Sequence, residues 1–238
     1  MATINLLYRD SYPVNDKISI RIPTVEEVLE CEDDYYGMVT ALTAMPIDLI
    51  MQLDEMGLDF TTMTEYDLFL LLFRGLQMQD THLIFGDLDL KKFSIGINEE
   101  TNEVVLVDRE NDIVINRMVQ GKIAATLRKI HRIEKNYRKP GNQEAKEYML
   151  ERARIKAKRN RKRNVTSQLE SLIIALVNTE QFKYDFESVK HLSIYQFNES
   201  VNQIAWKVDY DNRMFGVYTG NIRVKDLDPN ELNWLTHK

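Results

Sequence analysis

The stretch FSIGINEETNEVVLVD, from Phe93 to Asp108, decides the fold class of this 238-residue chain. Its runs FSIGI and EVVLVD are rich in β-branched residues, and the polar NEETN between them predicts a hairpin loop. HLIF (His82–Phe85) before the hairpin and IVI (Ile113–Ile115) after it also have strand character. Helical patterns flank this region on both sides. We therefore predict an α+β fold, mainly α-helical, in which a small antiparallel element (residues 80–115) lies between an N-terminal helical unit and long C-terminal helices.

Upstream of the hairpin, residues 1–79 predict an acidic helical unit with a short N-terminal strand. Alternation of apolar and polar residues in KISIRIP (Lys17–Pro23) predicts that strand. Thr24 and Thr64 each precede an acidic residue by three positions, which is the pattern of a capping box. We therefore expect one helix to begin after each of these threonines.

Downstream of the hairpin, residues 116–164 predict a long basic helical hairpin. An apolar stripe with helical spacing runs from Asn116 to Tyr137. The KPG at Lys139–Gly141 interrupts the stripe, and a second helical pattern with many basic residues follows.

Residues 165–238 predict an aromatic-rich helical C-terminal part. Ser193 and Gln196 form another capping box, so a helix is expected to begin there. We expect that helix to end near Val208, because the following MFGVYTG contains two glycines and shows no helical period.

Charge is divided unevenly along the chain. Residues 1–116 contain 7 basic and 23 acidic groups, residues 117–163 contain 17 and 4, and residues 164–238 contain 7 and 10. The three blocks therefore carry net charges of −16, +13 and −3, against −6 for the whole chain. Oppositely charged blocks predict attraction within one chain or between chains, although a single exposed pair contributes only about 0–1 kcal/mol.

The basic block ends in ERARIKAKRNRKRN, from Glu151 to Asn164, where the apolar positions of the helix fade. Three interpretations of this run remain open: binding of nucleic-acid phosphates, docking on an acidic protein surface of this chain or of a neighbour, and a solvated helix end. The candidate binding residues are Arg152, Arg154, Lys156, Lys158, Arg159, Arg161, Lys162 and Arg163.

Two acidic clusters are candidate metal sites, because carboxylate oxygens and imidazole nitrogens bind divalent cations. We favour solvated loops for both clusters and therefore predict no metal site. The candidate ligands are Asp80, His82, Asp87 and Asp89 in the first cluster and Asp108, Glu110 and Asp112 in the second. The sequence contains no nucleophile elbow, zinc-binding pair or phosphate-binding glycine loop. We therefore expect neither an enzyme nor a bound cofactor.

The single cysteine, Cys31, excludes an internal disulfide bond and is typical of a reducing cytoplasm. The first residues lack the basic and apolar regions of a signal peptide. The longest apolar runs are far too short to span a bilayer. We therefore expect a soluble intracellular protein without a membrane partner.

The C-terminal third resembles the ends of structural or tail (baseplate) assembly proteins of tailed bacteriophages and prophages. The resemblance rests on FESVKHLSIYQFNESVNQI (Phe186–Ile204) and MFGVYTGNIRVKDLDPNELNWL (Met214–Leu235). Such proteins tend to finish with Gly-x-Tyr-x-Gly and then Leu-Asn-Trp, as Gly216–Gly220 and Leu232–Trp234 do here. The resemblance implies a role in virion morphogenesis, either as a tail or baseplate component or as a tail assembly chaperone. It also implies the host cytoplasm during assembly and, for a structural component, the virion tail.

Aromatic side chains are dense in this third of the chain, where they fit either a core or a partner surface. We take Trp206, Tyr218 and Trp234 as candidate partner-surface residues. The sequence thus predicts a non-enzymatic bacteriophage protein that contacts other phage structural proteins or further copies of itself. The alternative is a nucleic-acid-binding or regulatory phage protein that uses the basic helix Arg152–Arg163.

Overall fold

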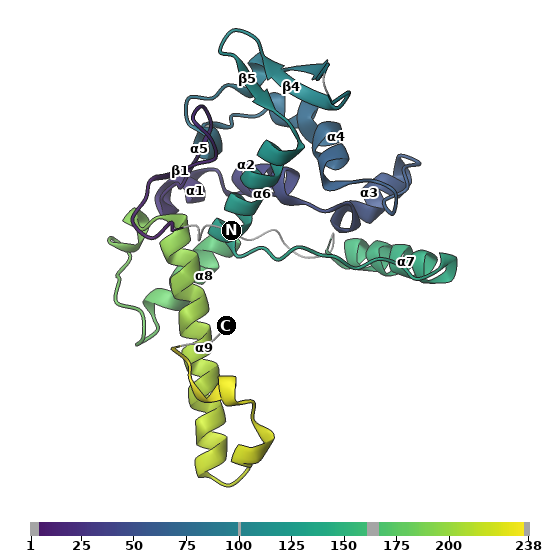
Figure 1. The fold of residues 1–238 in the computed structure, drawn as a ribbon. Helices are drawn as coiled ribbons and strands as arrows, with labels where there is room; N and C mark the ends of the chain where they lie inside the picture. Colours follow the sequence, from purple (N-terminus) through teal and green to yellow (C-terminus); the bar gives the residue numbers. More distant parts are fainter. Residues whose placement is uncertain (1–4, 100, 161–166, 236–238) are drawn as a thin grey trace.

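The computed structural model describes residues 5–99, 101–160 and 167–235, and it confirms the α+β fold class (Figure 1). Helices dominate, and two small antiparallel sheets lie among the elements of the first half. In chain order the elements are β1 (Ser11–Pro13), β2 (Ser19–Arg21), α1 (Val25–Glu30), α2 (Glu32–Thr43), η1 (Pro46–Leu49), α3 (Ile50–Glu55), α4 (Glu65–Gln77), α5 (His82–Phe85), η2 (Leu90–Lys92), β3 (Ser94–Ile97), β4 (Val104–Asp108), β5 (Ile113–Ile115), α6 (Arg117–His131), α7 (Gln143–Asn160), α8 (Gln168–Val177), η3 (Val189–His191), α9 (Ile194–Tyr218), η4 (Val224–Asp226) and η5 (Pro229–Leu232), where η denotes a short 3-10 helix.

The three-stranded sheet contains the predicted hairpin and has the strand order β3-β4-β5. Its register places Leu106 between Ile95 on β3 and Ile115 on β5. Leu106 and Ile115 are buried, whereas Ile95 on the edge strand is exposed. The hydroxyl of Tyr66 on α4 lies 3.0 Å from the carbonyl oxygens of Val104 and Ile115, so the sheet is anchored to α4.

A second hairpin, β1–β2, contains the strand predicted within Lys17–Pro23. The side chain of Asn15 turns the chain, because its Oδ1 accepts hydrogen bonds from the N–H groups of Lys17 (2.9 Å) and Ile18 (2.7 Å). The sequence analysis did not identify β1, because its three residues, which include Pro13, are too few to show an alternating pattern.

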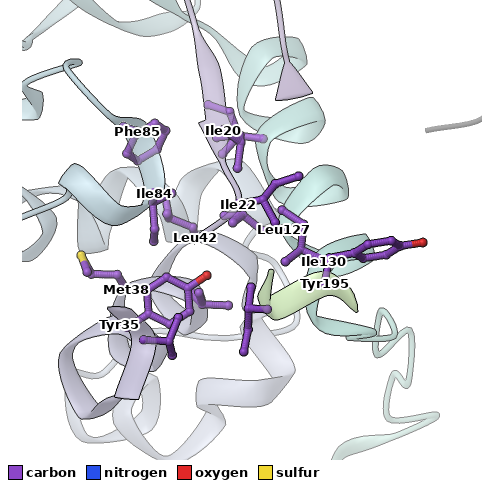
Figure 2. Close-up of a cluster of buried hydrophobic side chains, with 14 of the residues drawn as sticks. Ile20, Ile22, Tyr35, Met38, Leu42, Ile84, Phe85, Leu127, Ile130 and Tyr195 are labelled. Atoms are coloured by element: carbon purple, nitrogen blue, oxygen red, sulfur yellow. The ribbon is translucent and has the colours of Figure 1, made fainter. Parts of the chain in front are cut away.

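The strand predicted for HLIF is wrong, because these residues form the short helix α5. Periodicity cannot distinguish a strand from a helix in a run of four apolar residues. Ile84 and Phe85 are buried on the side of α5 that packs against β2 (Figure 2). Gly86 ends the helix with a φ of +60°, a conformation that suits glycine. The strands of the predicted 80–115 element therefore begin only at Ser94.

The predicted helix starts at Thr24, Thr64 and Ser193 are confirmed. Each of these side chains accepts a hydrogen bond from the N–H group three residues later. The side chain of that later residue in turn accepts from the N–H of the cap, so both halves of the capping box are present.

Helix α6 lies at the centre of the fold. It packs against α2, α4, α9, β2 and β5. Figure 2 shows Leu127 and Ile130 of α6 together with Ile22, which directly follows β2, and Leu42 of α2. Each aliphatic side chain that is fully buried contributes about 1.5–3 kcal/mol relative to an exposed one, so α6 stabilises several neighbours at once. The buried apolar residues of α6 are Val119, Ile123, Ala124, Leu127 and Ile130.

The predicted helical hairpin of residues 116–164 is wrong in its geometry. Helix α6 ends earlier than expected, because Arg132 adopts a left-handed conformation (φ +54°) and the N–H of Ile133 bonds back to the carbonyl of Arg128 (2.9 Å). The chain then continues without regular secondary structure to α7. Helix α7 packs on α3 at one side of the body instead of lying along α6 (Figure 1).

A buried ion pair holds the end of α6 in place. The side chain of Arg128 is only 6% exposed, and its Nη2 lies 2.6 Å from Oε1 of Glu65 and also donates to the carbonyl of Thr43. Lys135, beyond the helix end, places its Nζ 2.8 Å from the other oxygen of Glu65. Glu65 opens α4, where the helix dipole favours negative charge. The Glu65 carboxylate thus connects α4, α6 and the segment after α6, and Arg128 extends this connection to α2.

We expect Arg128→Met to lower the free energy of unfolding by about 3 kcal/mol, because it leaves the Glu65 carboxylate buried beside Lys135 alone. Urea unfolding monitored by circular dichroism measures this change. The control Arg74→Met alters an exposed arginine of α4 and should cost less than about 0.5 kcal/mol. Equal losses in the two variants would contradict this role of Arg128.

A second polar contact joins α2 to α6. The hydroxyl of Tyr35 and Nε2 of His131 lie 3.0 Å apart. Burial lowers the pKa of His131 to about 4. In the unfolded chain this imidazole would protonate near its ordinary pKa of about 6.5, so the unfolded state binds the proton first. The stability that neutral His131 contributes is therefore complete above pH 6.5 or so and is lost as the pH falls toward 4.

Lowering the pH from about 7.5 to about 5 should therefore reduce the free energy of unfolding by about 1–2 kcal/mol through His131. His131→Gln keeps a polar group opposite Tyr35 but removes the titrating imidazole, so it should flatten this decrease. Urea unfolding of both proteins at several pH values tests the prediction. An equally steep decrease in the variant would assign the pH dependence to other groups.

Candidate functional site

The first half of the basic helix α7 is attached to the body. Leu150 is buried in a second core cluster with residues of α3 and α4. Lys146 Nζ lies 2.8 Å from Asp59 Oδ2 and 5.8 Å from the centroid of the Phe60 ring. Hydrogen bonds from Lys146 and Thr61 lower the pKa of Asp59 to about 2. Asp59 therefore remains ionised, and the start of α7 is held on an acidic surface of its own chain.

The second half of α7 carries the basic residues singled out in the sequence. Arg154 turns toward the body, and its Nη2 lies 2.6 Å from Oδ2 of Asp54 on α3. Arg161, Lys162 and Arg163 lie outside the described residues. Four other cations are exposed, and within the described part of the chain none of them forms an ion pair. These four are Arg152, Lys156, Lys158 and Arg159.

The exposed side of α7 carries a narrow stripe that the sequence analysis missed. Tyr148, Arg152, Ile155 and Arg159 are spaced by four, three and four residues, which places them on one face of a helix. Tyr148 is 61% exposed, Ile155 is 48% exposed, and Cζ of Arg152 lies 6.0 Å from the Tyr148 ring centroid. We call these four residues the outer face of α7. Their spacing was visible in the sequence, but attention to charge alone did not reveal it.

A group of exposed carboxylates, which we call the acidic ridge, lies where α1 meets α2. It consists of Glu30, Asp34 and Asp80. Glu30 ends α1, Asp34 lies in the first turn of α2, and Asp80 precedes α5. Burial and then the negative charges of Asp34, Glu30 and Asp80 raise the pKa of Cys31, which lies between α1 and α2. Folding brings Asp80 to the other two from about fifty positions away in the sequence. No local pattern could therefore have predicted the ridge.

The two acidic clusters considered as metal sites do not assemble into such sites in the described part of the chain. No group of three or more His, Cys, Asp and Glu side chains is placed there to hold a metal ion. In the second cluster, Asp112 pairs with Lys17 (2.8 Å) and Glu110 pairs with Lys92 (3.2 Å). In the first cluster, Asp80 and Asp89 accept backbone hydrogen bonds within their own turns. These carboxylates thus organise turns and surface ion pairs.

A cleft of about 760 Å³ lies between the β1–β2 hairpin and the turn that joins β4 to β5. Its lining includes the cations Lys17, Arg21 and Lys92. Each of the three already pairs with a carboxylate, so the cleft does not present their charges freely to an anionic ligand. The partners are Asp112, Glu27 and Glu110, respectively.

Helix α9 extends away from the body (Figure 1). Every buried side chain of this helix lies before Asn198. The expected end near Val208 is wrong, because the helix continues to Tyr218 through the glycine-containing segment. We call the part of α9 from Trp206 onward, together with residues 219–235, the C-terminal arm. No helix in the described ranges is long and apolar enough to cross a membrane.

The Gly-x-Tyr-x-Gly string folds the chain back along the C-terminal arm. The N–H of Asn221 bonds to the carbonyl of Gly216 (2.9 Å), and the N–H of Gly220 bonds to that of Val217 (3.0 Å). This pair of bonds is the Schellman pattern that ends many helices. Gly220 has a φ of +76°, and a Cβ on Gly216 would lie 2.7 Å from Cδ1 of Ile222. The left-handed backbone therefore favours glycine at position 220, whereas at position 216 the packed side chain of Ile222 leaves little room for a Cβ.

The three aromatic residues singled out in the sequence all belong to the C-terminal arm. Trp206 lies beneath the guanidinium of Arg132, with 5.4 Å from Cζ to the ring centroid. The ring of Trp234 lies 5.6 Å from Nζ of Lys207, which places the returning chain against α9. Both tryptophans are partly buried, whereas Tyr218 is 82% exposed. Trp206 thus joins the arm to the end of α6, Trp234 holds the returning chain on α9, and Tyr218 remains accessible to a partner.

We expect Gly216→Val to displace Ile222 and to release the returning segment from α9. The released segment should be cleaved faster in limited proteolysis, and the emission of Trp234 should shift to the red. The control Gly75→Val also places a β-branched residue in a helix, but no atom lies within 4 Å of its Cβ position. By helix propensity alone it should change the free energy of unfolding by less than about 0.5 kcal/mol, and it should leave the segment protected. Equal cleavage of the two variants would contradict the close packing at Gly216.

A family model described as the YomV second domain matches residues 158–238. The match begins in the last turn of α7 and includes α8, α9 and the C-terminal arm. It indicates a protein of phage or prophage type, in agreement with the resemblance seen in the same part of the sequence. No curated protein and no solved structure shows significant similarity to the chain.

Proposed function

We propose that this chain is a non-enzymatic bacteriophage protein that acts through protein–protein contacts in virion morphogenesis. Its role is that of a tail or baseplate structural component or of a tail assembly chaperone. Its partners are other phage structural proteins or further copies of the chain. It works in the host cytoplasm during assembly and, as a structural component, remains in the virion tail.

The observation that carries this proposal is the match of residues 158–238 to a domain of phage type. The matched region contains the C-terminal arm, which presents Tyr218 and Phe215 with 82% and 69% of their surfaces exposed. Exposed aromatic side chains on a projecting helix are typical anchors for a protein partner. The outer face of α7 supplies a second exposed surface with tyrosine and arginine side chains, which are also enriched at interfaces.

In a phage or prophage that encodes this chain, we expect deletion of its gene to abolish tailed particles. Complementation with Tyr218→Ser should restore far fewer infectious particles than the wild type, because the exposed anchor is lost. The control Tyr8→Ser changes another exposed tyrosine (88%) outside the C-terminal arm and should complement fully.

Mass spectrometry of the purified wild-type particles separates the two forms of the proposal. A structural component is found in fixed proportion to the other tail proteins, whereas an assembly chaperone is present in the lysate and missing from the particles. Normal infectious particles from the deletion strain would overturn both forms.

Nucleic-acid binding is the second candidate function. Arg152, Lys156, Lys158 and Arg159 are exposed along one helix, and the ring of Tyr148 beside them could stack on a base. Such binding would weaken steeply with salt, because each neutralised phosphate releases a counterion. This salt dependence distinguishes nucleic-acid binding from a protein–protein contact that depends on Tyr218.

A further inference from the structure

The outer face of α7 has the composition of an interface centre. Tyr148 and Ile155 alternate with Arg152 and Arg159 over about 17 Å of helix. Tyrosine and arginine provide a large share of binding energy at protein interfaces, and an exposed isoleucine between them favours removal from water. Tyr148 and Ile155 keep 61% and 48% of their surfaces exposed on this face, where Arg152 lies over the Tyr148 ring.

The acidic ridge has the complementary composition. Glu30, Asp34 and Asp80 are exposed, and among the described residues none of them forms an ion pair. Beside them in the sequence, Leu29 is 41% exposed and Met78 is 85% exposed. The ridge thus offers carboxylates for the arginines of α7 and apolar side chains for Tyr148 and Ile155.

One molecule cannot bring these two surfaces together. Figure 1 shows α7 on one side of the body, whereas α1 and α5, which flank the ridge, lie on the opposite side. Within a single chain, α7 already pairs with carboxylates through Arg154 and Lys146, but only on the side that faces α3 and the segment after it. The outer face therefore needs a ridge from another molecule.

We infer that the outer face of α7 docks on the acidic ridge of a second copy of this chain. The contact is heterologous, because each copy uses one surface and leaves the other free for the next copy. Repetition of such a contact produces a ring or a filament. This inference rests on the proposed function, in that it names the chain itself as a partner for a protein that works by protein contacts.

The charge balance favours a second copy of this chain over nucleic acid as the partner of the outer face. The whole chain has a net charge of −6, which repels phosphates at long range, whereas each copy carries both a basic and an acidic surface. Exposed ion pairs are individually weak, so we expect a transient contact that high salt disrupts.

The test is sedimentation velocity of the purified full-length chain at about 50 mM and about 300 mM salt. The wild type should associate at low salt and lose most of that association at high salt, since screening acts on exposed charges. Arg152→Glu with Arg159→Glu should remain monomeric. Glu30→Lys with Asp34→Lys should also remain monomeric. An equimolar mixture of the two double variants should associate again, because the reversed charges are then complementary.

The control for net charge is Lys122→Glu with Lys129→Glu, which reverses two exposed lysines of α6 and should leave association intact. Circular dichroism confirms that each variant is folded. A monomeric wild type at low salt, or a mixture that stays monomeric, would overturn the inference. A second outcome would assign the outer face to nucleic acid instead. In that outcome the wild type does not self-associate but binds a fluorescent DNA or RNA oligonucleotide, and the Arg152 and Arg159 double variant does not bind it. None of these outcomes depends on particle formation, so the inference and the proposed function can fail separately.

Discussion

The packing of α6 is the constraint on which the rest of this structure depends. This helix contacts α2 from the acidic unit, β5 from the sheet and α9 from the C-terminal part. The main core accordingly combines side chains that lie as far apart in the sequence as Leu6 and Phe197. Arg128 adds a directional contact to this apolar packing through its buried pair with Glu65. Helices α7 and α9, with their exposed surfaces, are attached to the body that α6 organises.

The basic block has two different physical roles that its composition alone does not distinguish. On and just after α6, Arg128 pairs with Glu65 and Arg132 pairs with Glu199 of α9 at 2.7 Å, so these cations connect elements of one molecule. On α7, only Arg154 among the described residues of the run forms an ion pair within the chain. Desolvation makes the inner pairs sensitive to loss of a partner, whereas the outer cations remain free to meet another surface.

Local chemistry explains which features could be predicted from the sequence. The capping boxes, the β3–β4 hairpin and the α+β class depend on neighbouring residues, and they are confirmed. The end of α6 depends on distant partners, because Lys135 reaches Glu65 where the helical pattern would otherwise have continued. The length of α9 was also mispredicted, because Gly216 does not end the helix. Ile222 packs against Gly216, and this contact explains a glycine inside the helix. The acidic ridge and the direction of α7 arise only from the tertiary fold.

Hydrogen–deuterium exchange of the purified protein at low concentration tests this account most directly. It predicts that the amides of α6 are the slowest to exchange and do so only through global unfolding. It also predicts faster exchange, through local opening, in α7 beyond Leu150 and in the second half of α9, because few apolar side chains are buried there. Exchange in α6 as fast as in the end of α7 would contradict the account, because the body would then not be organised around α6.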